Sequence, residues 1–382
     1  MRQQRMNGLR GLPVGSAAIA GALALTACGA SDNSGSTDAS PTPTAAAATS
    51  DAGGIPCGKA ATLRASGSTA QQYAMQNWIK KYTRACPDIK INYTGNGSGG
   101  GQDDFLAGRT SFAGSDSALS TEQVSRSKKV CSGRGQAVHL PMVGGPVAVG
   151  FNLPGMKELT LDAPTLAKIF NARITTWNDP AIAKLNSGVE LPSTQIRAAH
   201  RSDSSGTTDG FTSYLRTAAP DAWPYEHSKE WKAKGGQSAK SSSGLADKVK
   251  QTEGSIGYFE LSYAAARNIP TVALSTGAPA PVQPSILSAS KSIADSKIVG
   301  KGKDLTLQIN HATKAPGAYP VDVVTYEIVC DKGNKPATWP ATKAFLTYSA
   351  SKKGQEDLSF QGYATLPAGI VNKVRSTVNA LS

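Results

Sequence analysis

The chain of 382 residues has few of the side chains from which metal and nucleic-acid sites are built. It holds only four histidines, and His139, His227 and His311 stand isolated in the sequence, which argues against a metal centre. Its lysines are scattered, and no aromatic residues interleave with them in the manner of a nucleic-acid interface. After the N-terminus, no apolar run is long enough to span a bilayer. The formal net charge of +13 nevertheless favours anionic ligands or surfaces.

The N-terminus carries an export signal. Three arginines among the first ten residues precede a small apolar run at residues 12–25. This pattern is typical of a signal peptide, to which we assign residues 1–27. The run ends in Leu25-Thr26-Ala27-Cys28, which resembles the lipobox of bacterial lipoproteins. The resemblance implies that Cys28 is lipidated and anchors the chain on the extracytoplasmic face of the cell membrane; the alternative is a plain secretory signal in which Cys28 is incidental.

Residues 28–56 have the composition of a flexible tether, since they contain almost no large apolar side chain. The four cysteines beyond Cys28 are widely and irregularly spaced, which argues against a zinc site. An even number of cysteines outside the cytoplasm favours two disulfides, for which three pairings are possible. We favour Cys57–Cys86 with Cys131–Cys330, because the first pair brackets a single strand–helix unit.

Strands and helices alternate after Cys57. The pattern predicts strands at Ala61–Ala65, Lys90–Thr94 and Ser111–Gly114, with a helix between each pair. Such alternation is typical of βαβ units and a mainly parallel sheet. A polar turn follows each strand, so the three turns are expected at the carboxyl edge of the sheet, where open α/β sheets bind ligands.

The rest of the chain continues this α/β pattern without an internal repeat. Residues 275–315 are rich in Ser, Ala and Pro and show little strand character except at 305–309. The other elements that we predict are strands at 136–142, 146–151, 196–199, 255–259 and 321–330, and helices at 164–170, 180–185, 244–252, 341–349 and 367–381.

Three small-residue turns each open a predicted helix: Gly67-Ser68-Thr69, Gly97-Ser98-Gly99 and Ser205-Gly206-Thr207. Free backbone N–H groups and hydroxyls at a helix mouth are the donors that an oxyanion needs. Arg201, at a strand end just before the third turn, adds a permanently charged fork. Asp203 is expected either to hold that guanidinium in position or to cap the helix. A single such turn could be an ordinary Ser/Thr cap beside a surface Arg; three favour an anion site.

One carboxylate is expected at the same mouth. Asp116 follows the strand predicted at 111–114, so it lies at the edge that carries the turns. An ionised carboxylate can only accept hydrogen bonds, and it therefore suits an anion that still carries a proton. Phosphate carries one at neutral pH and sulfate does not, so sulfate would leave an unmade hydrogen bond that costs roughly 1–3 kcal/mol. The sequence therefore predicts a phosphate site with Asp116 as the discriminating residue.

Several segments resemble the periplasmic-type phosphate-binding protein of the ABC phosphate importer. The resemblance covers nearly everything from about Leu63 to the C-terminus, and a bulky aromatic often stands where this chain has Ala70. The segments that carry it are Gly67–Thr69, Gly95–Gly101 with Asp103–Phe105, Phe112–Ser120, Trp177–Gly188, Arg201–Leu215 and Gly254–Ala264. The residues that it implies as phosphate contacts are Thr69, Ala70, Ser98, Asp116, Arg201, Ser205, Gly206 and Thr207.

The resemblance also implies a two-lobed periplasmic-binding-protein fold of type II. Each lobe would be a mainly parallel sheet flanked by helices, with the ligand cleft between the lobes. We assign residues 57–151 with 320–382 to lobe I and residues 152–319 to lobe II. The implied function is to capture phosphate and deliver it to the membrane permease of an ABC transporter. We expect a monomer with no cofactor, no catalytic activity and no nucleic-acid partner.

Three other functions are weighed against this one. A receptor for sulfate, molybdate or tungstate would keep the fold, and Asp116 argues against it. An NAD-dependent enzyme would use Gly95–Gly100 as a G-x-G-x-x-G motif, with Asp116 about 20 residues beyond it, but reduced nicotinamide is not supplied outside the membrane. A phosphate-ester hydrolase would use Ser204 or Ser205 with His200 as base, although the G-x-S-x-G elbow is missing.

Overall fold

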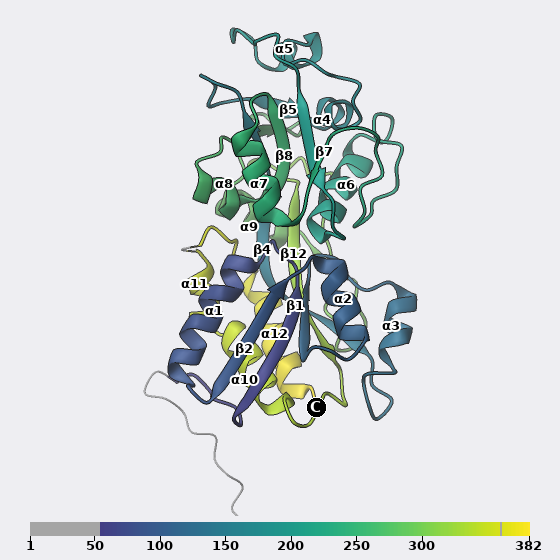
Figure 1. Cartoon of the computed structure of the whole chain (residues 1–382), viewed down its shortest axis with the longest axis vertical. Helices are drawn as coiled ribbons and strands as arrows, with labels where there is room; N and C mark the ends of the chain where they lie inside the picture. Colours follow the sequence, from purple (N-terminus) through teal and green to yellow (C-terminus); the bar gives the residue numbers. More distant parts are fainter. Residues whose placement is uncertain (1–53, 360) are drawn as a thin grey trace, which may run out of the picture. The chain divides into compact units, whose positions relative to one another are not determined.

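The computed structural model of the protein describes residues 54–359 and 361–382. The predicted signal peptide, Cys28 and nearly all of the predicted tether lie outside these residues. An eight-stranded sheet runs through the described part (Figure 1). Its strands are, in spatial order, β2 (Ile89–Gly95), β1 (Ala61–Gly67), β3 (Phe112–Ser115), β12 (Asp322–Cys330), β4 (Ala137–Asn152), β8 (Ser255–Glu260), β6 (Arg197–Arg201) and β7 (Gln237–Ala239).

The outer strands of this sheet are parallel and its central strands are antiparallel. β1 pairs in parallel with β2 and β3, and β6 pairs in parallel with β7 and β8, as the alternation of strands and helices predicted. β12 runs antiparallel to β3 and β4, and β4 runs antiparallel to β8. The two central strands thereby join the two parallel groups into one continuous sheet.

β4 is one strand of 16 residues, so the prediction of two strands with a break between residues 142 and 146 was wrong. The glycines in that break pair with β12, which holds the segment extended. They also allow close packing: a Cβ on Gly144 would lie 2.6 Å from Ile293 Cδ1, and one on Gly145 would lie 3.2 Å from Glu260 Oε1. Here the glycines mark close packing and not a turn.

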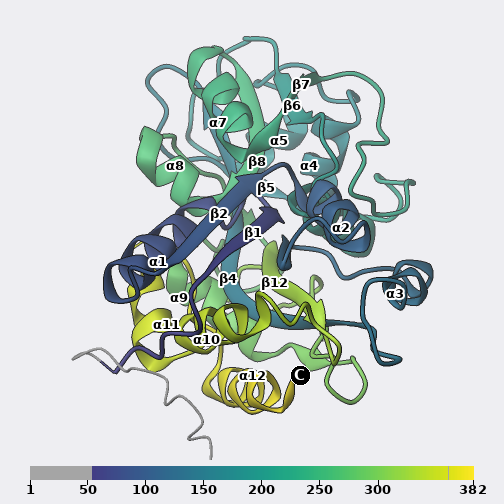
Figure 2. The same ribbon diagram turned by 60° about the horizontal axis from the view of Figure 1, so that its bottom comes forward.

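The buried apolar side chains form two large clusters. The first core includes Trp78 and Phe345, and the second core includes Trp177 and Tyr258. β4 and β12 contribute residues to both cores. In Figure 2 these two strands lie between helices α7 and α8 on one side and helices α10 and α12 on the other. The helices of the first core are α1 (Gln72–Ala85), α9 (Ile286–Ala294), α10 (Trp339–Ser349), α11 (Lys352–Ser359) and α12 (Ala368–Ala380), and those of the second are α4 (Ala163–Phe170), α5 (Pro180–Leu185), α6 (Gly206–Ala218), α7 (Ser241–Gln251) and α8 (Leu261–Arg267).

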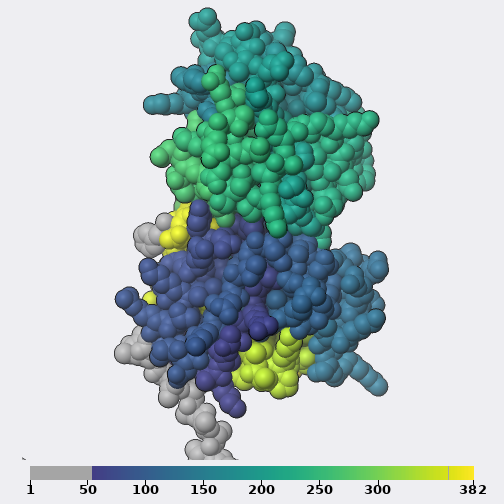
Figure 3. All heavy atoms as spheres, in the orientation of Figure 1, coloured from purple at the N-terminus to yellow at the C-terminus, as the bar shows by residue number. Residues whose placement is uncertain are grey.

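Most of the second core's segments, in teal and green, form the upper part of Figure 3, and the purple and yellow segments of the first core form the lower part. A smaller cluster, which includes Phe105 and Ile328, packs under the remaining helices. These are α2 (Ser98–Leu106) and α3 (Thr121–Ser127).

Helix α9 lies within residues 275–315, for which little strand character was expected outside 305–309 and no helix was predicted. A reciprocal pair of hydrogen bonds between Ser285 and Ser288 caps the helix, and Ala289 and Ile293 pack into the first core. Helix α11 was likewise not predicted, and its Leu358 is fully buried. Two further pairs of short strands form: β5 (Thr160–Asp162) with β9 (Ala273–Ser275), and β10 (Lys297–Ile298) with β11 (Leu307–Gln308). β11 lies within the strand predicted at 305–309.

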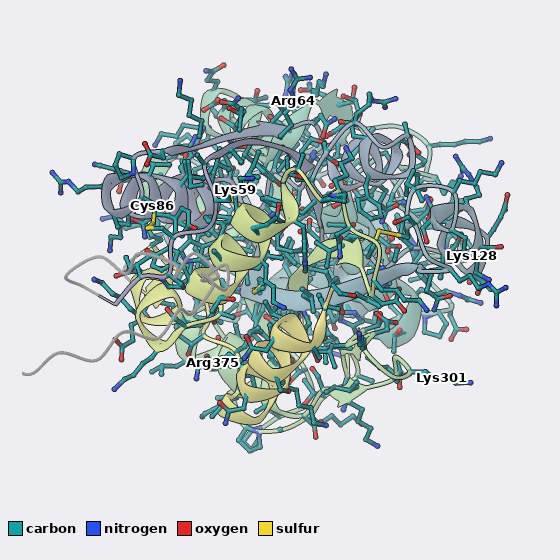
Figure 4. All side chains as sticks on the ribbon, turned by 90° about the horizontal axis from the view of Figure 1, so that it is seen from below. Lys59, Arg64, Cys86, Lys128, Lys301 and Arg375 are labelled. Atoms are coloured by element: carbon teal, nitrogen blue, oxygen red, sulfur yellow. A yellow bond between two sulfur atoms is a disulfide. The ribbon has the colours of Figure 1, made fainter. Side chains whose placement is uncertain are left out.

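Both disulfides form with the favoured pairing. Cys57 bonds to Cys86 and Cys131 bonds to Cys330, each with 5.5 Å between the Cα atoms. The first ties the start of the described chain to the end of α1, and Figure 4 labels Cys86 at this bond. No helix within residues 54–359 and 361–382 has both the length and the apolar character that crossing a membrane requires.

Candidate anion-binding site

The first turn of the site lies where β1 ends. Gly67 has φ +138°, and a Cβ there would lie 1.9 Å from the carbonyl oxygen of Gly114 at the end of β3, so only glycine fits. Ser68 N donates to that same oxygen at 2.8 Å. This close approach brings the Ser68 hydroxyl within 2.5 Å of Asp116 Oδ1, to which it donates.

The glycine-rich turn brings the mouth of α2 against the third predicted turn. Gly97 has φ +88°, and a Cβ on it would lie 2.7 Å from Ser204 O. A Cβ on Gly99 would lie 2.0 Å from Ser204 Oγ, while its N–H donates to Ser204 O at 3.0 Å. Ser98, between the two glycines, accepts a hydrogen bond from Asp116 N at 3.1 Å. The glycines are therefore needed for contact between segments far apart in the sequence.

Asp116 is held by hydroxyl groups from three different elements. Ser68 and Thr325 donate to its Oδ1, the latter at 2.8 Å, and Thr207 donates to Oδ2 at 3.2 Å. Burial raises the pKa of Asp116 above its ordinary value, although these hydrogen bonds and the charge of Arg201 oppose the shift. The carboxylate thus lies at the anion site with no cation in direct contact within the described part of the chain.

Arg201 enters the site from the end of β6 and is 2% exposed. Its Nε donates to Asp203 Oδ1 at 2.6 Å and its Nη2 donates to Asp203 Oδ2 at 2.5 Å, which makes a two-pronged ion pair. Burial raises the pKa of Asp203, but the hydrogen bonds and charge of Arg201 outweigh it and hold that pKa below its ordinary value. Nη1 donates to Ser242 Oγ at 3.2 Å. A guanidinium has five N–H donors, so donors remain for a ligand.

Helix α6 begins at Gly206 with its N-terminus in the site. Ser205 caps it by accepting from Thr208 N at 3.2 Å. A Cβ on Gly206 would lie 2.5 Å from Ser98 Oγ and 2.6 Å from Asp116 Cβ, so glycine is required where the helix meets the loop of Asp116. The first N–H groups of a helix have no partner within it, which leaves them available to an anion.

The structure brings all eight predicted contact residues into one connected set. Ala70 joins it through its N–H, which donates to Ser68 Oγ at 3.1 Å. Thr69 joins it through Ser242, which contacts Arg201 as well. The set also contains Ser98, Asp116, Ser205, Gly206 and Thr207.

Three residues of this network were not predicted as part of the site. Ser68 belongs to the Gly67-Ser68-Thr69 turn, so the sequence did contain a signal for including its hydroxyl in the site. Ser242 lies in a run of serines before a predicted helix, which is a recognisable start signal. Thr325 carries no such signal, because within the β12 sequence it looks like any residue of a buried strand.

The two enzyme interpretations find no matching geometry. His200 stacks on Trp231 with 4.7 Å between ring centroids, and its Nδ1 lies 3.0 Å from Arg201 O, so it is not paired with a serine. The G-x-G-x-x-G turn packs on Ser204, where a dinucleotide phosphate would have to lie. Within residues 54–359 and 361–382, no three His, Cys, Asp or Glu side chains form a group that could hold a metal ion.

A cavity of about 580 Å³ reaches the site at Asp116 and Ser117. Asp209 of α6 lines it and accepts from Ser117 Oγ at 2.6 Å and contacts His227 Nδ1 at 2.7 Å. Burial raises the pKa of Asp209, but the hydrogen bonds from His227 and Ser117 outweigh it and bring the pKa below its ordinary value. The hydrogen bond to Asp209 raises the pKa of His227. The hydrogen bond from Ser117, in the loop after β3, to Asp209 is therefore a second contact between this loop and α6.

The comparisons with known proteins agree on one family. A model of the PBP superfamily domain matches residues 38–353. The chain is 41% identical over 365 residues to the phosphate-binding protein PstS 3 of Mycobacterium leprae (strain TN), which covers 95% of this chain and 96% of that protein. It is 42% identical over 368 residues to the phosphate-binding protein PstS 2 of Mycobacterium tuberculosis (strain ATCC 25618 / H37Rv), again with 95% and 96% covered.

Solved structures show the same fold at lower sequence identity. A high affinity periplasmic phosphate-binding protein bound with phosphate aligns with a TM-score of 0.66 at 22% identity, over 83% of this chain and 93% of that one. A phosphate-binding protein from Stenotrophomonas maltophilia aligns with a TM-score of 0.66 at 17% identity, with the same coverage. These likenesses establish the two-lobed fold. With the near full-length identity above 40%, the chain belongs to the PstS family of phosphate-binding proteins within the PBP superfamily.

Proposed function

We propose that this protein binds inorganic phosphate outside the cytoplasm and delivers it to the permease of an ABC-type importer. Its near full-length relatives are named phosphate-binding proteins, and a protein of the same fold has been solved with phosphate bound. The observation that carries the proposal is the meeting of Asp116 with Arg201 and the mouth of α6 in one network. Such a network offers many donors and one acceptor to a protonated oxyanion.

Each part of the network has a role in this proposal. Arg201 supplies charged donors and Asp203 holds its guanidinium in plane. Asp116 accepts the hydrogen bond from the protonated phosphate oxygen, which sulfate cannot offer. The neutral donors would be the hydroxyl and backbone N–H groups of Thr69, Ala70, Ser98, Ser205, Gly206 and Thr207.

The proposal includes two lobes that close over the ligand, formed by residues 57–151 with 320–382 and by residues 152–319. The hydrogen bond from Gly99 N to Ser204 O and that from Thr207 to Asp116 each join one lobe to the other. A ligand that contacts both lobes stabilises the closed state, because only that state makes all of its contacts. We also propose that the protein is a monomer without catalytic activity and is anchored by a lipid on Cys28, a residue outside the described part.

Isothermal titration calorimetry of the purified protein with phosphate and with sulfate tests the proposal. We expect phosphate to bind and sulfate to bind at least about 1,000-fold more weakly, because a site built to pair with a donor rejects an analogue that lacks it. Equal affinities would remove the role assigned to Asp116. Absence of phosphate binding, or hydrolysis of a phosphate ester by the protein, would contradict the function itself.

A further inference from the structure

Helix α7 begins beside the anion site in an unusual conformation. Its first residue, Ser241, has φ +67°, a left-handed conformation that is uncommon outside glycine. Ser241 N donates to Asp203 Oδ1 at 3.2 Å, and Ser241 Oγ accepts from Gly244 N at 3.2 Å. This start ties α7 to the carboxylate that holds Arg201. It also leaves the next side chain, Ser242, fully buried.

Ser242 contacts both proposed lobes through its two polar groups. Its N–H, which has no partner within the helix, donates to Thr69 Oγ1 at 3.0 Å. Its hydroxyl accepts from Arg201 Nη1 at 3.2 Å and lies 2.9 Å from Thr69 Oγ1. Thr69 and Arg201 are 132 positions apart in the sequence. Within the described residues, Ser242 is the hydrogen-bond partner that they share.

The direction of these hydrogen bonds decides what Thr69 can offer a ligand. A hydroxyl has one proton and two acceptor lone pairs. If Ser242 Oγ gives its proton to Thr69 Oγ1, both lone pairs of Thr69 are filled, one by the N–H and one by the hydroxyl of Ser242. Thr69 can then act only as a donor. With an oxyanion beside Thr69, this is the direction that gives every hydroxyl proton an acceptor.

We propose that Ser242 is a positioning residue of the anion site, which directs a hydrogen-bond chain from Arg201 through Ser242 to Thr69 and thereby turns the Thr69 hydroxyl toward the ligand. The inference rests on the proposed binding of phosphate and adds a residue to that site. Because the charged guanidinium starts the chain, it polarises both hydroxyls in the same sense. Because the chain crosses between the lobes, it exists only in the closed state, so Ser242 should affect the release of the ligand more than its capture.

Substitution Ser242→Ala tests this assignment against a matched control, Ser255→Ala. Ser255 is a buried serine of β8 whose hydroxyl donates to Val249 O at 2.8 Å, and it is not part of the anion network. Phosphate affinity would be measured by calorimetry, and the rates of binding and release by stopped-flow fluorescence. Thermal unfolding without phosphate would be measured for both variants.

We expect Ser242→Ala to weaken phosphate binding about 10-fold to 100-fold, mainly through faster release, because it removes a bond to a charged group. Ser255→Ala should bind like the unsubstituted protein. A further variant, Thr69→Val, tests whether the two residues are coupled. In a protein that already carries Thr69→Val, Ser242→Ala should weaken phosphate binding clearly less than it does alone.

Two results would overturn the assignment while leaving the proposed function intact. One is Ser242→Ala that binds phosphate like the unsubstituted protein, or whose effect is simply additive with Thr69→Val. The other is Ser242→Ala that unfolds well below Ser255→Ala, since its role would then be structural. Failure of the unsubstituted protein to bind phosphate would instead contradict the proposed function, and with it this inference.

Discussion

Arg201 and Asp116 lie at the same site but come from different elements. Arg201 forms an ion pair, whereas Asp116 has no charged partner within the described residues. Asp203 pairs with Arg201 through two short hydrogen bonds. Only neutral hydroxyls, from Ser68, Thr207 and Thr325, contact the carboxylate of Asp116. A paired guanidinium attracts any oxyanion, whereas an acceptor held by neutral donors distinguishes anions by whether they carry a proton. Affinity and selectivity are thus expected to reside on different sides of the site.

Arg201→Ala removes the positive charge from the site and should have the largest effect on phosphate affinity. It deletes the charged donors to phosphate and leaves the half-buried Asp203 without its cationic partner. We expect phosphate affinity to fall about 1,000-fold or more in calorimetry. Arg201→Lys serves as the control, because it keeps the charge and loses the fork. Affinity near that of the unsubstituted protein in Arg201→Ala would mean that the site lies elsewhere.

Asp116→Asn replaces the carboxylate of the site with an amide, and it should alter the selectivity between anions more than the affinity for phosphate. The Asn amide can donate a hydrogen bond to sulfate, which the carboxylate cannot do. We expect the ratio of phosphate to sulfate affinity to fall at least about 100-fold, since it depends on one unmade buried hydrogen bond. Competition titrations of each anion measure this ratio directly. An unchanged ratio would show that another residue distinguishes the anions.

The sequence predicted the parts of the site that depend on local chemistry. The turns at Gly97 and Gly206 were recognised because glycine beside Ser or Thr is typical of a helix start. What these glycines contact was not predictable, since Ser204 and Asp116 reach them only through tertiary packing. The same holds for Ser242, whose partner Thr69 lies 173 residues away.

Errors in the predicted fold have the same origin. Local glycine signals predicted a break within β4, but pairing with β12 along the strand overrides them. No helix was predicted at α9, because Ser and Ala dominate its sequence, whereas two of its side chains, Ala289 and Ile293, pack into the first core. Thr325 donates to Asp116 from the point where the register of β12 against β4 shifts, a tertiary arrangement that no local pattern reveals.

Glu327 is a second carboxylate that, like Asp116, contacts no cation within the described residues. It is fully buried on β12, and burial raises its pKa to about 8, against the opposing effect of the neighbouring Gln71 amide. The folded state therefore keeps this proton at pH values where the unfolded chain has already lost it. From the ordinary pKa of Glu up to about pH 8 the folded state binds more protons, so this residue makes the protein less stable as pH rises.

Glu327→Gln should remove that contribution while preserving the shape of the side chain, and it should have the smallest effect of the three substitutions on phosphate binding. We expect the variant to gain stability relative to the unsubstituted protein as pH rises from 5 to 8, by on the order of 1 kcal/mol per pH unit. Thermal unfolding across this range measures the gain, with exposed Glu253→Gln as control. Parallel pH profiles for Glu327→Gln and the unsubstituted protein would mean that Glu327 has the same pKa in the folded and unfolded states. The fold would then tolerate a buried, ionised carboxylate at this position without a cation beside it.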